Sequence, residues 1–178
     1  LALMYLDAAR LPARIDGDGG ILLLAEQDRS RWEQAGIKRG MLHFAASGTG
    51  PNVTRYHLEA GIAACHALAP SFAATDWRQI VSLYDALLEL DGSPIAALNR
   101  AVAVAQASGH RAGLDALDQI KNRKALENYH LLHAVAGQLW LDAGEKAKAA
   151  ECFRRALARA KLPAERMLLE TKLARCGR

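Results

Sequence analysis

Aromatic residues and long apolar runs are scarce in this chain of 178 residues. Phe, Trp and Tyr make up 6% of it, although 51% of the residues are hydrophobic. Much of that share is alanine, which favours helices packed through small side chains over a β-sandwich. The apolar run of residues 21–25 is far shorter than the about 20 residues that a membrane-spanning helix needs. No basic segment followed by an apolar one opens the chain, so we expect no secretory signal and no contact with a membrane.

Cysteine is also rare, and its pattern differs from that of a disulfide framework. Cys65, Cys152 and Cys176 are widely separated and form no C-x-x-C pair. Isolated cysteines among alanine and leucine are typical of small buried side chains in a reducing compartment. We therefore expect a cytoplasmic protein.

Motifs of catalysis are missing from the sequence. It contains no nucleophile elbow, phosphate-binding loop, zinc-protease motif or dinucleotide-binding fingerprint. Cys65 and His66 are neighbours, and adjacent helical residues point about 100° apart, so they cannot pair as nucleophile and base. We expect no enzymatic activity and no cofactor.

Two short patterns resemble metal sites. Residues 16–20 begin like a calcium loop, but Gly20 and Gln27 stand where an EF-hand needs oxygen ligands, so a hairpin turn fits better. His130 and His133 lie one helical turn apart, yet no Cys or carboxylate has ligand spacing to them. We interpret them as histidines of the core or of a groove and expect no metal.

Charge is unevenly distributed along the chain. Its net charge is +4, but residues 153–178 hold eight Lys and Arg against Glu165 and Glu170, which leaves −2 for the rest. Basic residues near the end of a helix interact favourably with its dipole and are commonly solvated. Nucleic-acid binding by this tail is the less favoured alternative, because no aromatic residues interleave the charges for base stacking.

The first 53 residues have an irregular pattern. Residues 1–10 show an apolar helical rhythm without an initiator Met, and we interpret them as the end of a helix in a fragment of a longer protein. Pro12 ends this helix, and residues 13–24 predict a small β-hairpin around an Asp-Gly turn. A helix capped by Asp28 or Ser30 follows. It is expected to carry Trp32, Ile37, Met41, Leu42 and Phe44 and to end at residues 48–52, the internal boundary.

From Thr54 onward the pattern is helical. Pro70 ends one helix, and Gly92-Ser93-Pro94 supplies a stop, a cap and a helix start. Gly109 and Gly144 lie 35 residues apart, each at the turn of a helix pair. The expected helices span residues 54–68, 76–90, 94–107, 110–121, 127–143, 145–160 and 164–176.

The helix pairs repeat, and the segment from His133 to Ala156 fits the tetratricopeptide (TPR) pattern of about 34 residues. Small side chains at Gly137, Ala149 and Ala156 let two helices approach, and Trp140 and Phe153 fill the groove beside them. The middle repeat is degenerate, since Asp118 occupies the aromatic position of Tyr84 and Phe153. We expect an all-α fold of TPR-like antiparallel helical hairpins in a short solenoid. Residues 1–53 form a first domain that packs on the repeats of residues 54–178.

The densest group of candidate functional residues is Glu-Gln-Asp-Arg-Ser-Arg-Trp at 26–32. One interpretation is a helix cap with an ion-pair network. The other is an interface that docks another domain, where Arg and Trp are favoured anchors. Asn99-Arg100 could clamp a peptide carboxylate, although the clamp residues of known carboxylate-binding repeats occupy other positions. The candidate interaction residues are Arg10, Arg14, Asp16, Glu26, Gln27, Asp28, Arg29, Arg31, Trp32, Asn99 and Arg100.

The strings at residues 7–16 and 23–32 resemble the C-terminal region of bacterial sigma factors of the extracytoplasmic-function (ECF) group that carry a TPR-like extension. The resemblance continues through 56–66, 76–87, 93–103 and 129–132. It implies a longer protein whose preceding part holds two sigma domains, which bind core RNA polymerase and read the promoter. Promoter DNA would be contacted only through that part.

The resemblance leads to the expected function. This chain would be the regulatory, protein-interaction extension, with the sigma domains of its own protein or core RNA polymerase as partners. Arg29, Arg31 and Trp32 would dock them together with the concave face of the repeats. A stand-alone TPR-like adaptor that binds a peptide or protein is the alternative, and a helical enzyme is a third possibility.

Overall fold

The computed structural model describes residues 1–17, 19–48 and 52–177 of the chain. In this described part it is helical and contains no strand, which confirms the all-α prediction. The contacts divide the chain into two compact units, Leu1–Asp91 (unit 1) and Gly92–Arg178 (unit 2), which are considered separately below. None of the described helices is long and apolar enough to span a bilayer.

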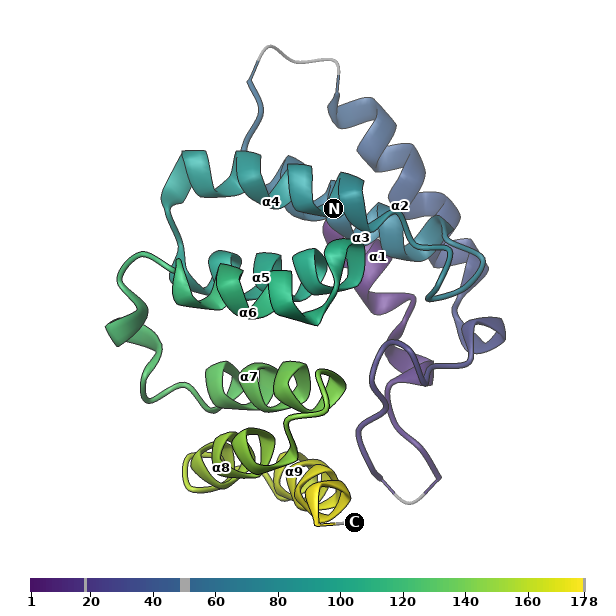
Figure 1. Ribbon diagram of the computed structural model, residues 1–178. Helices are drawn as coiled ribbons and strands as arrows, with labels where there is room; N and C mark the ends of the chain where they lie inside the picture. Colours follow the sequence, from purple (N-terminus) through teal and green to yellow (C-terminus); the bar gives the residue numbers. More distant parts are fainter. Residues whose placement is uncertain (18, 49–51, 178) are drawn as a thin grey trace. The chain divides into compact units, whose positions relative to one another are not determined.

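The described residues of unit 1 form four α-helices (Figure 1). They are α1 (Ala2–Ala8), α2 (Gln34–Ser47), α3 (Arg55–Leu68) and α4 (Trp77–Asp91), with single 3₁₀ turns η1 (Leu11–Ala13) and η2 (Arg29–Arg31) between α1 and α2. Helix α1 packs on both α2 and α3. At its closest approach to α2, a Cβ on Gly40 would lie 2.8 Å from Leu6, so the absence of a side chain there lets the two helices meet.

The strands expected within residues 13–24 do not form. The two arms meet in a single antiparallel bridge between Ile15 and Ile21. These residues remain 54% and 37% exposed, and a two-stranded hairpin without a hydrophobic partner is marginal in water. The turn itself is present: the Gly20 amide donates to Asp16 Oδ1 at 2.7 Å. Asp18 lies outside the described residues.

One further prediction for the first part of the chain needs correction. Trp32 does not lie in the long helix, because Asp28 caps η2 instead and α2 begins only at Gln34. The domain boundary expected after residue 53 stays a prediction. Ala63 and Ala64 of α3 share one core with Leu6 of α1, so the segment expected to pack on the repeats is continuous with the first helical hairpin. The expected stop at residues 48–52 falls partly on residues 49–51, outside the described residues.

Unit 2 is a succession of helical hairpins (Figure 1). Helix α5 (Pro94–Ser108) pairs with α6 (His110–Asp118), α7 (His130–Asp142) pairs with α8 (Lys146–Leu157), and α9 (Pro163–Cys176) packs on α8. The 3₁₀ turn η3 (Arg123–Leu126) connects the two pairs. The seven helices predicted after Thr54 are all present in the two units, with ends shifted by a few residues.

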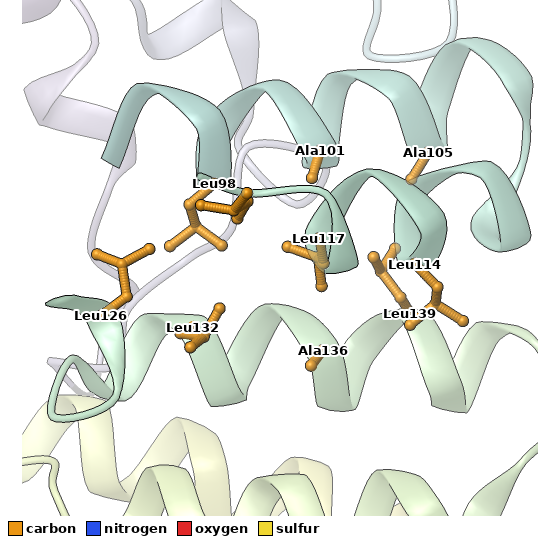
Figure 2. Close-up of a cluster of buried hydrophobic side chains, with 10 residues drawn as sticks. Leu98, Ala101, Ala105, Leu114, Leu117, Leu126, Leu132, Ala136 and Leu139 are labelled. Carbon is orange, nitrogen blue, oxygen red and sulfur yellow. The ribbon is translucent and has the colours of Figure 1, made fainter. Parts of the chain in front are cut away.

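Leucine and alanine form the first core of unit 2. Figure 2 shows leucines of α5, α6 and α7 pointing toward one another between the helices, with Ala101 of α5 and Ala136 of α7 in the same cluster. Leu98, Leu117 and Leu132 are at most 1% exposed. A Cβ on Gly113 would lie 2.5 Å from the Ala105 side chain, so α5 and α6 can approach this closely only with glycine there.

The second core of unit 2 follows the small-residue pattern read from the sequence. Ala149, Phe153 and Ala156 of α8 are fully buried. A Cβ on Gly137 of α7 would lie 2.8 Å from the Phe153 ring, so the phenyl ring fills the space that glycine leaves open. Asp118, at the corresponding position of the preceding pair, is exposed and forms an ion pair with Arg123, which explains how that repeat tolerates a carboxylate.

Candidate interaction site around Trp32

Trp32 is the centre of the candidate site in unit 1. It follows η2 in extended conformation and is 3% exposed. The ring packs in the core that α1, η1, α2 and α3 build together, with Leu6, Ala9, Ala13, Ile37, Ala63 and Ala64 as its buried members. The indole is thus an internal anchor of unit 1, and the exposed surface above it belongs to its neighbours.

Two guanidinium groups lie against the Trp32 ring. Arg29 Cζ is 4.4 Å and Arg10 Cζ 5.5 Å from the ring centroid, distances at which a cation is attracted to the π-face. Arg29 Nη1 also donates to the carbonyl oxygens of His66 at 2.6 Å and Ala69 at 2.8 Å. These carbonyls stand at the end of α3, where the helix leaves acceptors unpaired and its dipole is negative. Arg29 therefore caps α3 and ties η2 to it.

Positive charge dominates the electrostatics of this cluster. Burial, then the neighbouring Arg14, lowers the pKa of Arg10, and burial lowers the pKa of Arg29. Burial, followed by repulsion from Arg10 and Arg29, lowers the pKa of His66 to about 4. The imidazole is therefore neutral near pH 7 and packs edge-on against Trp77 at 5.3 Å.

Several buried polar atoms around Trp32 have no hydrogen-bond partner. In the described part of the chain, seven buried side-chain nitrogen or oxygen atoms have no hydrogen-bond partner, and five of them gather here. They are Arg10 Nε, Gln27 Oε1, Arg29 Nη2, Trp32 Nε1 and His66 Nδ1. Buried polar groups are nearly always paired, so this concentration marks the cluster as the candidate site of unit 1.

The remaining candidate residues of unit 1 shape the loop around the cluster. Asp28 Oδ1 accepts hydrogen bonds from the Ser30 amide at 2.9 Å and its hydroxyl at 2.7 Å, and Glu26 Oε2 accepts from the Leu23 amide at 2.8 Å. Gln27 Nε2 donates to the Leu22 carbonyl at 3.2 Å. Arg14 and Arg31 are exposed.

The contacts bear on the two interpretations of residues 26–32. Arg10 makes an ion-pair contact with Asp7 at 3.9 Å. Cation–π contacts and the α3 carbonyls hold the segment. Asn99 and Arg100 lie on α5 in unit 2, so they belong to a separate body of the chain.

Sequence reasoning did not find His66 and Ala69 as partners of Arg29. They lie 37 and 40 residues further along the chain, and their contribution is a backbone carbonyl that any residue could supply. No side-chain pattern could have identified them. The end of the expected helix at residue 68 was the available signal, since helix ends attract basic side chains.

The site residues from Arg10 to Trp32 lie in a segment that matches a known family model. Residues 1–48 match the model of a family of unknown function, DUF6596. Over 172 residues, 97% of the chain, the sequence is 34% identical to an uncharacterized protein of Rhizobium meliloti (strain 1021). The chain spans 40% of the length of that relative.

Proposed function

We propose that this chain is the regulatory, protein-interaction region of an ECF-type RNA polymerase sigma factor, built from TPR-like helical hairpins in a short solenoid. The observation that carries the proposal is the α7–α8 hairpin, where Gly137 meets Phe153 as the TPR code requires. The resemblance of residues 7–16 and 23–32 to such sigma factors supports the identity of the longer protein. The greater length of the Rhizobium relative is compatible with preceding sigma domains.

The cluster around Trp32 would position the docking surface. Arg29 and Trp32 are held inside unit 1, so their role is to fix the loop of residues 26–32. Exposed Arg31 and Arg14 would then contact the sigma domains or core RNA polymerase, together with the concave face of the repeats. In this proposal the protein acts in the cytoplasm, and promoter DNA is read by the sigma domains alone.

Hydrogen exchange tests this docking directly. The 178-residue chain is mixed with the separately produced sigma domains of its own protein, or with core RNA polymerase, and amide exchange is compared with that of the free chain. We expect slower exchange at residues 26–32 in the complex. Arg31→Ala should weaken the complex, whereas Lys38→Ala, an exposed basic control on α2, should not. Unchanged exchange at residues 26–32 with both partners would contradict the proposal.

A stand-alone adaptor that binds a peptide or protein is the second candidate. Ile95 of α5 is 49% exposed next to exposed Asn99, so this helix presents both apolar and polar groups to a ligand. Affinity capture from the source cell, followed by mass spectrometry, separates the two functions. Recovery of one protein unrelated to polymerase, without any polymerase subunit, would favour the adaptor.

A further inference from the structure

Unit 1 holds positive charge that its own carboxylates do not neutralise. Arg10 and Arg29 lie against one indole ring. Within the described residues, the ion-pair contact of Arg10 is a 3.9 Å approach to Asp7, and Arg29 has none. The carbonyls at the end of α3 receive Arg29 Nη1, but Nη2 of the same group is left without an acceptor. Arg10 Nε and Trp32 Nε1 are also donors without an acceptor.

The chemistry of these atoms specifies the missing partner. Arg10 Nε, Arg29 Nη2 and Trp32 Nε1 can only donate, so they need oxygen acceptors. Two guanidinium forks favour a planar oxyanion that accepts two bonds at once, as a carboxylate does. The cluster reaches the surface through Arg10, whose side chain is 11% exposed. A modest shift of this side chain would open the buried donors to a ligand from outside.

The charge of the surroundings distinguishes between possible anions. Unit 1 carries 8 basic and 11 acidic residues, a net charge of −3. Nucleic acid carries many charges and would be repelled by this unit as a whole. A single carboxylate on a protein segment would be attracted mainly by the two nearby arginines. It therefore fits the local charge better than a nucleic acid does.

We propose that the Arg10–Arg29–Trp32 cluster binds the carboxylate of a Glu or Asp side chain from a protein partner. This inference rests on the proposed interaction function and names the chemistry that the partner must present. The carboxylate bridges the two guanidinium groups and accepts from the indole N–H. Binding therefore couples η1, η2 and the end of α3, which the cluster already joins.

The indole resonance of Trp32 offers a specific readout, because the chain has three tryptophans. The ¹⁵N-labelled 178-residue chain is titrated at constant ionic strength with an acetylated Ala-Glu-Ala amide, its Gln counterpart, and inorganic phosphate. We expect a saturable shift of the Trp32 indole signal with the Glu peptide, absent with the Gln peptide. The signal of Trp140, which lies in unit 2, serves as the internal reference.

Substitutions of single basic residues test which side chains bind the carboxylate. Arg10→Gln should weaken Glu-peptide binding about tenfold, the expected effect of losing a charged hydrogen bond. Lys38→Gln, which changes an exposed basic residue on α2, should change it less than twofold. Circular dichroism verifies that each variant is folded, and the peptide comparison on the unmodified chain remains valid if Arg10→Gln is not.

Three outcomes would overturn the inference. The first is a Trp32 signal that moves no more than that of Trp140. The second is an equal shift with the Glu and Gln peptides, and the third is a stronger response to phosphate. If residues 26–32 are protected by polymerase or sigma domains while the Glu peptide has no effect, the proposed function stands and the carboxylate site fails. The reverse pattern retains the site and removes the sigma-factor partner.

Discussion

The two units of this chain differ in net charge and in the sequence separation of the contacts that hold their helices together. Unit 2 carries 15 basic and 8 acidic residues, a net charge of +7, and unit 1 is net negative at −3. In unit 2 the helices pair with their sequence neighbours, and Gly109 alone, with φ of 95°, connects α5 to α6. In unit 1, α1 packs against α3, and Arg29 is bonded to carbonyls 37 and 40 residues away.

The two units also differ in the composition of their cores. The buried members of the two clusters in unit 2 are leucine, alanine, Ile120 and Phe153. The core of unit 1 has a tryptophan held between arginines, with hydrogen-bond donors left unpaired. An apolar core maximises packing, whereas unpaired buried donors reduce stability unless a partner satisfies them. We therefore expect unit 2 to act as the scaffold and unit 1 to carry the interaction site of the proposed function.

The largest expected effect is a loss of stability on substitution in the core of unit 2. Phe153→Ala removes a fully buried ring from α8 and should lower the free energy of unfolding by about 3–5 kcal/mol. Urea denaturation gives the size, and hydrogen exchange should locate the loss in α7–α9 with α1–α3 unchanged. Leu162→Ala, at a position 59% exposed, is the control and should stay within about 0.5 kcal/mol. Equal acceleration of exchange in both units would show that the distinction between them is wrong.

The next effect tests the long-range contact of unit 1. Arg29→Met keeps an apolar stem against Trp32 but removes both hydrogen bonds to the α3 carbonyls, so stability should fall by about 2 kcal/mol. Arg29→Lys should recover only part of this, because a lysine cannot reproduce the planar fork. Arg31→Met, on the exposed side, is the matched control. A similar loss for both Met variants would remove the capping role of Arg29.

Acid should destabilise unit 1 through His66. Its pKa of about 4 in the folded chain lies below the 6.5 of an unfolded histidine. The unfolded state therefore takes up a proton first, and stability is lost as pH falls from about 6.5 to about 4, by on the order of 2 kcal/mol. Urea titrations at several pH values measure this slope. His66→Gln should flatten it, and an unchanged slope in that variant would assign the acid sensitivity to other groups.

The smallest effect concerns a local cap in unit 2. The Ser93 hydroxyl accepts a hydrogen bond from the Ala96 amide at the start of α5. Ser93→Ala should cost about 1 kcal/mol and increase exchange in the first turn of α5 only. Ser108→Ala, at the other end of the same helix, should have no measurable effect. Loss of protection beyond α5 would mean that unit 2 is less modular than its contacts indicate.

Local signals explain why the helices after Thr54 were predictable. Ser93-Pro94 begins α5, and Gly109 and Gly144 lie at the turns with positive φ, as their sequence positions indicate. The small residues facing Phe153 were recognisable because the spacing of a helix pair repeats along the chain. Each of these features depends on residues within about one helical hairpin.

Tertiary contacts explain what the sequence could not reveal. The segment at 13–24 has the alternation of a hairpin, but strand formation depends on a packing partner that the described chain does not provide. Trp32 has the pattern of a helical core residue, yet its position is determined by Arg29 and the end of α3. The identity of the candidate residues was accessible from sequence, but the division between buried and exposed members was not.

The 37-residue separation between Arg29 and the His66 carbonyl has a consequence for synthesis of the chain. At translation rates of about 5–20 residues per second, Arg29 waits roughly 2–7 s for its acceptors to be made. During that interval the core around Trp32 lacks Ala63 and Ala64, which α3 contributes. Each hairpin of unit 2, in contrast, closes once its own second helix has emerged. We expect nascent chains ending before residue 66 to be the form most dependent on chaperones and most sensitive to proteases.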